Sequence, residues 1–126
     1  MDENAISNVI IGAAIEVHRE LGGPGLLEDL YEESLCCELG LRGLEVARQV
    51  TVPVAYKGQR LKKPLYLDVL VNDLVIVECK AAEDFHPVWE AQVLTYLRLT
   101  GKKLGLIINF GEKYVKDGVR RVVNGL

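Results

Sequence analysis

The stretch that decides the fold is "LYLDVLVNDLVIVECK", Leu65 to Lys80. It contains two runs of strand-forming residues, Leu65–Val71 and Val75–Lys80. Between them stand Asn72 and Asp73, residue types that tolerate the backbone conformations of a tight turn. The pattern therefore predicts a β-hairpin in the middle of the chain.

Three charged residues, Asp68, Glu78 and Lys80, interrupt these apolar runs. Burying an unpaired charge costs several kcal/mol, so the three either face solvent or are gathered for a purpose. Glu78 and Lys80 project from the same face of their strand, because side chains alternate. A three-residue turn would place Asp68 directly opposite Glu78, with Cβ atoms about 4.5–5.5 Å apart, whereas a two-residue turn would shift it by one position.

Two carboxylates at that distance repel each other unless a cation lies between them. Oxygen ligands suit Mg²⁺, and a lysine beside such a site can orient water or neutralise developing charge. The alternative is a half-exposed sheet in which Asp68, Glu78 and Lys80 form a cross-strand ion pair in solvent. The hairpin alone leaves both interpretations open.

Composition and charge restrict the class of protein. The 126 residues suffice for one domain, 1–126, with a real core, and the net charge of −3 does not suit a general nucleic-acid coat. Basic residues nevertheless cluster, and each cluster alone is interpreted as a solvated face. The clusters are Arg48 with Lys57, Arg60, Lys62 and Lys63; Lys102 with Lys103; and Lys113, Lys116, Arg120 and Arg121.

The three cysteines, Cys36, Cys37 and Cys79, form no CxxC pair and no zinc-ligand spacing. An odd number of cysteines without a disulfide framework suits a reducing compartment. The N-terminus lacks a hydrophobic signal core, and no apolar run approaches ~18 residues. These features predict a soluble cytoplasmic protein with no membrane partner.

The remaining elements follow from periodicity and from turn residues. Before the hairpin, the predicted elements are a helix over Ile6–Leu21 capped by Asn4 or Ser7, a helix over Leu26–Leu39 stopped by Gly40, a strand over 46–54 and a hairpin turn at Lys57-Gly58. After the hairpin, they are a helix from Pro87 to Gly101 and a buried strand over Leu104–Phe110. The tail over 112–126 is predicted to end in a helix or an edge strand. The order α-α-β-β-β-β-α-β predicts an α/β fold. Its sheet is mixed, because the last strand arrives through a helical crossover.

Two motifs resemble a known family. The arrangement D-x9-E-x-K, formed by Asp68, Glu78 and Lys80, resembles the signature of the PD-(D/E)XK nuclease superfamily. "GLLEDLY", Gly25 to Tyr31, is similar to the motif of the GxxExxY family within that superfamily. The similarity continues through "YEESL", "ELGLRGLEV", "PVAYKG", "VIVECKA", "HPVWEAQVLTYL" and "LGLIINFG". It implies a restriction-endonuclease-like core, a mixed central sheet flanked by helices.

The resemblance also implies roles for individual residues. Asp68 and Glu78 would bind the metal together with the backbone carbonyl of Cys79, and Lys80 would be the catalytic lysine. Glu28 would be a further helical carboxylate that reaches the metal directly or through water. Without the resemblance, a glutamate in a first helical turn is explained by its interaction with the helix N-terminus.

Gln92 and Tyr96 are spaced i, i+4 and share one helix face. They match the Q-x-x-x-Y element of exonuclease-like members, in which the glutamine steadies the site and the tyrosine approaches DNA. Tyr31 of the GxxExxY motif is grouped with Tyr96 as a substrate contact. The alternative is a glutamine that caps a backbone group and a tyrosine that belongs to the core.

The resulting prediction is a Mg²⁺- or Mn²⁺-dependent nuclease that hydrolyses DNA phosphodiester bonds with metal-activated water. The substrate could be single-stranded, duplex or branched DNA, or RNA, cut internally or from an end. The alternatives are a non-catalytic module that binds nucleic acid or protein on the same fold, and a scaffold whose charges pair with one another. A homodimer would extend the reach of such a small nuclease along DNA.

Overall fold

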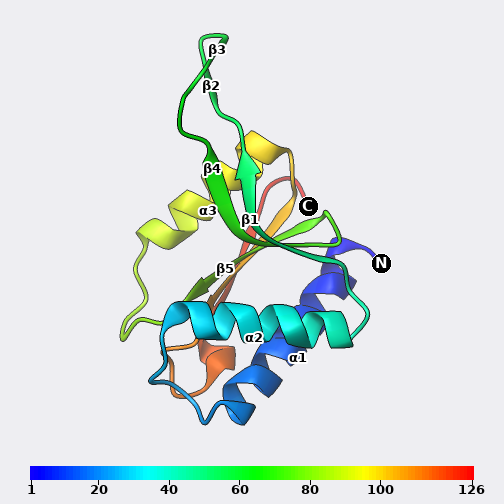
Figure 1. Ribbon diagram of the computed structural model, residues 1–126, viewed down its shortest axis with the longest axis vertical. Coiled ribbons are helices and arrows are strands. Elements are labelled where there is room, and N and C mark those ends of the chain that lie inside the picture. The colour runs from blue at the N-terminus through cyan, green and yellow to red at the C-terminus, as the bar shows by residue number, and fades with distance from the viewer.

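A five-stranded mixed β-sheet forms the centre of the molecule, and helices cover both of its faces (Figure 1). The computed structural model describes residues 1–126. In chain order the elements are α1 (Glu3–Glu20), α2 (Glu28–Leu41), β1 (Val46–Val52), β2 (Ala55–Tyr56), β3 (Gln59–Arg60), β4 (Leu65–Val71), β5 (Val75–Lys80), α3 (Val88–Thr100), β6 (Leu104–Asn109), the 3-10 helix η1 (Val115–Gly118) and β7 (Val119–Val123). This is the α/β architecture predicted from the sequence.

The strand order is β1-β4-β5-β6-β7. Neighbouring strands are antiparallel except β5 and β6, which run parallel and are joined by α3. The predicted helical crossover is therefore confirmed. The tail, predicted to end in a helix or an edge strand, forms η1 and then the edge strand β7. None of the helices combines the length and the apolarity needed to cross a membrane.

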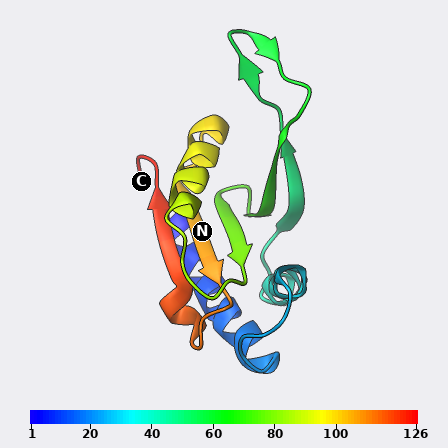
Figure 2. The ribbon, with the colours of Figure 1, turned by 90° about the vertical axis from the view of Figure 1, so that its left-hand side faces the viewer.

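Two hydrophobic cores lie on opposite faces of the sheet (Figure 2). The larger core joins α1 and α2 to one face, and the smaller core joins α3 to the other. β5 contributes to both because its side chains alternate: Val77 packs in the larger core and Ile76 in the smaller one. Burial on both faces explains why the sequences of β5 and β6 are nearly continuous apolar runs.

The hairpin of β4 and β5 has the bounds that the sequence predicted. Val71 pairs with Val75, so the turn uses the three residues Asn72–Leu74. Asn72 and Asp73 have positive φ angles of 51° and 56°, and the Leu74 N–H donates to the Val71 carbonyl at 3.0 Å. Of the two turns left open by the sequence, the structure has the three-residue one.

The helix ends differ from the prediction. The N-cap of α1 is Asp2, whose carboxylate accepts a hydrogen bond from the Ala5 N–H at 2.8 Å, rather than Asn4 or Ser7. α2 begins at Glu28 and continues through Gly40, the residue predicted to stop it. A glycine stops a helix when its φ is positive, and here the positive φ, 84°, belongs to Gly43.

The predicted strand over 46–54 is shorter in the structure and ends at Val52. Pro53 follows it and has no N–H to donate to a neighbouring strand. The chain then leaves the sheet as the two-stranded ribbon β2–β3, which projects beyond the body of the molecule (Figure 1). Its turn is the predicted Lys57-Gly58, with φ angles of 49° and 79°.

Candidate functional site

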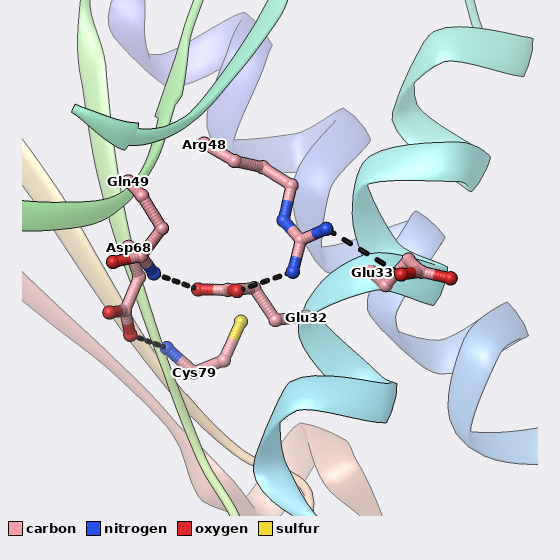
Figure 3. Close-up of polar contacts among 6 residues, drawn as sticks. All are labelled: Glu32, Glu33, Arg48, Gln49, Asp68 and Cys79. Carbon is pink, nitrogen blue, oxygen red and sulfur yellow. Dashed lines mark hydrogen bonds and ion pairs between the residues drawn. The ribbon is translucent and has the colours of Figure 1, made fainter.

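The site begins where β4 and β5 separate. Their ladder ends at the pair Val69–Val77, so by register Asp68 and Glu78 are the next two residues to face each other. The Asp68 carboxylate accepts a hydrogen bond from the Cys79 N–H at 3.2 Å (Figure 3), and the Asp68 N–H donates to Glu78 Oε1 at 3.4 Å. The two carboxylates therefore fill the opening between the strands, which we call the fork.

A rotation of β4 opens the fork. Val69 packs in the larger core, whereas Leu67, two residues earlier, packs in the smaller core on the other face of the sheet. Residues two apart in a regular strand share a face, so the strand turns over at Asp68. Gln49, which stands opposite Asp68 between ladder pairs of β1 and β4, has a positive φ of 50°.

Glu78 is buried, with 6% of its surface exposed. Burial raises the pKa of this carboxyl group to about 9, and the adjacent Asp68 adds to the increase through a hydrogen bond and through its negative charge. The positive charge of Lys80 partly opposes it. The fork therefore holds a proton near neutral pH unless a cation replaces it.

Lys80 belongs to the same site. Its positive charge lowers the pKa values of both Glu28 and Glu78. The Lys80 ammonium lies 5.6 Å from the centre of the Trp89 ring, and Trp89 in turn packs edge-on against Phe85. Trp89 was not predicted as a site residue. Its position beside Lys80 depends on the β5–α3 connection, which the local sequence does not reveal.

Glu28, the first residue of α2, faces the fork from the neighbouring helix. Partial burial of its carboxyl group raises the Glu28 pKa, Lys80 lowers it, and the carboxylates of Asp68 and Glu32 raise it further. Glu28 and Asp68 both line a cavity of about 380 Å³. The full lining is Leu27, Glu28, Asp29, Glu32, Gln49 and Asp68. The concentration of carboxylates in this cavity favours a cationic ligand.

A polar network that the sequence did not predict supports one wall of the cavity (Figure 3). Glu32 is buried on α2 and accepts hydrogen bonds from Arg48 at 2.7 Å and from Gln49 at 3.2 Å. Arg48 also lies 3.7 Å from the carboxylate of Glu33. The network ties α2 to β1 at the level where the strands rotate. Its one signal in the sequence is the spacing of Glu28 and Glu32, which places both on one helix face.

Tyr31 lies in the core. It is fully buried and stacks on Phe110 with ring centroids 4.7 Å apart. Its hydroxyl donates to the Gly23 carbonyl at 2.6 Å and accepts from the Leu26 N–H at 3.2 Å. This position does not support the substrate contact that the resemblance implied, because neither the ring nor the hydroxyl remains available. Tyr31 instead holds the loop that leads into Glu28.

The two polar residues of α3 differ in their surroundings. Tyr96 is half-buried, and burial raises the pKa of its hydroxyl, with further contributions from the negative charges of Glu78 and Asp68. Tyr96 packs against the smaller core, close enough to the fork for its carboxylates to affect the pKa of the hydroxyl. Gln92, one turn earlier, is exposed, and its side chain makes no hydrogen bond within the chain.

The donor set of the fork fits a metal ion that prefers oxygen ligands, because positive charge compensates the adjacent carboxylates of half-buried Asp68 and buried Glu78. No three His, Cys, Asp or Glu side chains stand close enough together to coordinate an ion by themselves. Glu28 is therefore near Asp68 and Glu78 without completing a three-carboxylate set. Further oxygen atoms would come from backbone, water or phosphate, as is usual for Mg²⁺. The Cys79 side chain is fully buried, which leaves its backbone at the fork.

Comparison with known proteins identifies the superfamily of the chain. The family model described as the PD-(D/E)XK nuclease superfamily matches residues 4–122. No curated protein and no solved structure gives a match. The matched region includes both strands of the fork, α2 and α3. Together with the mixed sheet and its flanking helices, the match confirms the predicted restriction-endonuclease-like core.

Proposed function

The chain belongs to the PD-(D/E)XK nuclease superfamily, and on this premise we propose that it is a metal-dependent nuclease that hydrolyses phosphodiester bonds of DNA. The observation that carries this proposal is the pair of carboxylates formed by half-buried Asp68 and buried Glu78, in a fork that also contains Lys80. Within the superfamily we assign the chain to the GxxExxY family, because Gly25, Glu28 and Tyr31 supply its motif.

Asp68 and Glu78 would hold Mg²⁺ or Mn²⁺, and the Cys79 carbonyl would be a further ligand. Glu28 would act through a water molecule, because it lies near Asp68 without completing a set of side-chain ligands. When bound, the metal supplies an activated water and neutralises charge on the phosphate. Binding also requires Glu78 to lose the proton that its raised pKa favours.

Lys80 would act on the reacting groups rather than on the metal. Its ammonium carries a charge beside two carboxylates and rests against Trp89. From this position it can orient water or stabilise the additional negative charge of the transition state. Trp89 would be a positioning residue, because its ring lies beside the Lys80 ammonium. On α3, Gln92 would steady the active site and Tyr96 would approach the nucleic acid.

The test is digestion of single-stranded, duplex and branched DNA and of RNA, each with Mg²⁺, with Mn²⁺ and with EDTA. We expect metal-dependent cleavage by the wild type and none by Asp68→Asn. Asp117→Asn, a substitution at an exposed carboxylate outside the fork, is the matched control and should retain activity. A wild type that is stabilised by metal but cuts no substrate would instead support a non-catalytic binding module.

A further inference from the structure

The segment 53–64 forms a projecting element that the proposed catalytic site does not use. It contains β2 and β3, which pair only with each other and stand apart from the central sheet. Both ribbon views show it extending beyond the body of the molecule (Figures 1 and 2). All residues from 55 to 63 are exposed, including Tyr56 at 62% and Leu61 at 46%. We call residues 53–64 the basic ribbon.

The basic ribbon carries the opposite charge from the rest of the molecule. It contains Lys57, Arg60, Lys62 and Lys63 and no acidic residue. The other 114 residues therefore carry a net charge of −7, against −3 for the whole chain. None of the four cations forms a salt bridge. Four unpaired positive charges on one exposed element are complementary to a polyanion.

Packing does not account for the ribbon. A two-stranded sheet without a hydrophobic face is marginally stable in water. Apart from the two short strands, the backbone hydrogen bond recorded within the segment is that from the Leu61 N–H to the Val54 carbonyl, at 2.8 Å. The ribbon therefore adds little to the stability of the fold, and its composition is better explained by contact with a partner.

The basic ribbon is directly connected to the fork, because β4 begins at the end of the ribbon and contains Asp68. Lys63 precedes Asp68 by five residues, which span at most about 16 Å at a full strand rise of ~3.3 Å per residue, because Lys63 lies in a bend before β4 begins at Leu65. At 3.4 Å per base pair, this distance equals roughly five base pairs of a duplex. The major groove of B-DNA, about 12 Å wide, admits a two-stranded ribbon, whereas that of A-form RNA is deep and narrow.

We propose that the basic ribbon binds the phosphates that border the major groove of duplex DNA, within about half a helical turn of the bond that lies at the fork. This inference rests on the proposed nuclease function for the position of the scissile bond. It assigns the affinity for DNA to an element separate from the metal site, and it explains how a chain of net negative charge binds a polyanion.

The test compares three sets of substitutions in fluorescence anisotropy with a labelled DNA duplex in EDTA, where no cleavage occurs. The first set is Lys57→Gln, Arg60→Gln, Lys62→Gln and Lys63→Gln. The second exchanges the same residues for the other basic type, Lys→Arg and Arg→Lys. The third places four glutamines elsewhere on the surface, at Lys103, Lys113, Lys116 and Arg121.

If four phosphate contacts are lost, the slope of log K against log salt should fall by about 3–4, and affinity near 0.1 M salt should weaken about 10²–10³-fold. The charge-preserving set should bind like the wild type. The set at Lys103, Lys113, Lys116 and Arg121 should lose less than about threefold. Because the ribbon has no core, both ribbon sets should retain the melting temperature of the wild type.

The outcomes separate this inference from the proposed function. If the wild type cuts duplex DNA but the ribbon glutamines leave affinity and salt slope unchanged, the ribbon inference is overturned and the nuclease stands. Ribbon-dependent binding without any cleavage supports the inference and contradicts the nuclease. Equal losses in both glutamine sets, equal affinity for duplex RNA and duplex DNA, or no binding of duplex DNA would each overturn the ribbon inference.

Discussion

Glu78 has the most unfavourable surroundings of any carboxylate in the fork. It is almost fully buried and adjacent to Asp68, and both conditions penalise its ionised form. A protein that used Glu78 only as a surface residue would gain nothing from this arrangement. The repulsion is useful when a cation binds, because binding then relieves it.

The pH dependence of stability tests this view of Glu78. The folded-state pKa is raised to about 9 from an ordinary value of 4.5. Between these values the folded state binds more protons than the unfolded state, so stability should fall as pH rises, by at most about 1.4 kcal/mol per pH unit. Glu78→Gln should abolish this decline. Urea unfolding from pH 5 to pH 9 in EDTA provides the measurement, and superimposable curves would show that Glu78 is simply solvated.

Lys80 and Asp68 should respond differently to substitution. Lys80→Ala removes a charge that acts on the transition state, so activity should fall about 10²–10³-fold while metal binding persists. Asp68→Ala removes a ligand, so both activity and stabilisation by metal should be lost. Single-turnover cleavage and metal titration monitored by melting temperature distinguish the two. Loss of metal binding in Lys80→Ala would contradict the separate roles.

At the scale of elements, loops anchored by buried side chains place Glu28 and the end of β5. Asn109 at the end of β6 is fully buried and bonds three backbone groups: it accepts from the N–H groups of Ala82 and Gly111 and donates to the Ala82 carbonyl. Only glycine fits at position 111, because a Cβ there would lie 2.1 Å from the Ala82 carbonyl oxygen. These contacts fix the chain just after Lys80.

Asn109→Ala should therefore destabilise the protein by about 2–4 kcal/mol, because it leaves these backbone groups without their partner. Activity should also fall, since the Ala81 backbone interacts with Glu28. Asn124→Ala is the matched control: Asn124 makes one side-chain bond, to the Lys102 carbonyl, and its loss should cost about 1 kcal/mol. Equal losses of unfolding free energy in the two variants would contradict the anchoring role of Asn109.

Tyr31 provides the corresponding anchor before α2. Tyr31→Phe retains the stacking on Phe110 but removes the hydrogen bonds to Gly23 and Leu26, so unfolding free energy should fall by about 1–3 kcal/mol. Tyr114→Phe, at an exposed position, should have no effect. Chemical denaturation gives both values. An unchanged stability in Tyr31→Phe would remove the basis for a structural role of this motif residue.

The elements differ in how well the sequence predicts them, for physical reasons. The bounds of both strands of the β4–β5 hairpin were predicted to the residue, because the apolar runs and the turn residues between them are local signals, whereas the length of the turn was left open. The end of α2 was not, because Gly40 adopts ordinary helical geometry. The rotation of β4 at Asp68 and the contact of Glu32 with Arg48 were also missed. They depend on how α2 packs against β1, and no local pattern specifies this packing.

At the scale of the whole molecule, negative charges gather at the fork, where, on the proposed function, a metal ion and a proton would compete for Glu78. The fork and the cavity beside it contain Glu28, Glu32, Asp68 and Glu78, whereas the four free cations of the basic ribbon stand apart from them. The acidic total charge is therefore compatible with binding of DNA, because the cations of the basic ribbon lie apart from these carboxylates.

This competition gives a prediction for the stability of the entire chain. Metal ligands must be deprotonated, and Glu78 retains its proton up to a pKa of about 9, so the apparent metal affinity should rise with pH by at most tenfold per unit. The Mg²⁺ concentration is held fixed. Each tenfold gain in affinity then raises the unfolding free energy by at most about 1.4 kcal/mol. Stabilisation by metal should therefore grow from pH 6 to pH 8, while the metal-free protein loses stability over the same range.

Asp68→Asn should show no metal effect at either pH, and Glu78→Gln should show a weak effect that does not change with pH. Urea unfolding at both pH values, with Mg²⁺ and with EDTA, supplies the four measurements for each protein. A wild-type stabilisation that is equal at pH 6 and pH 8 would place the bound metal away from Glu78.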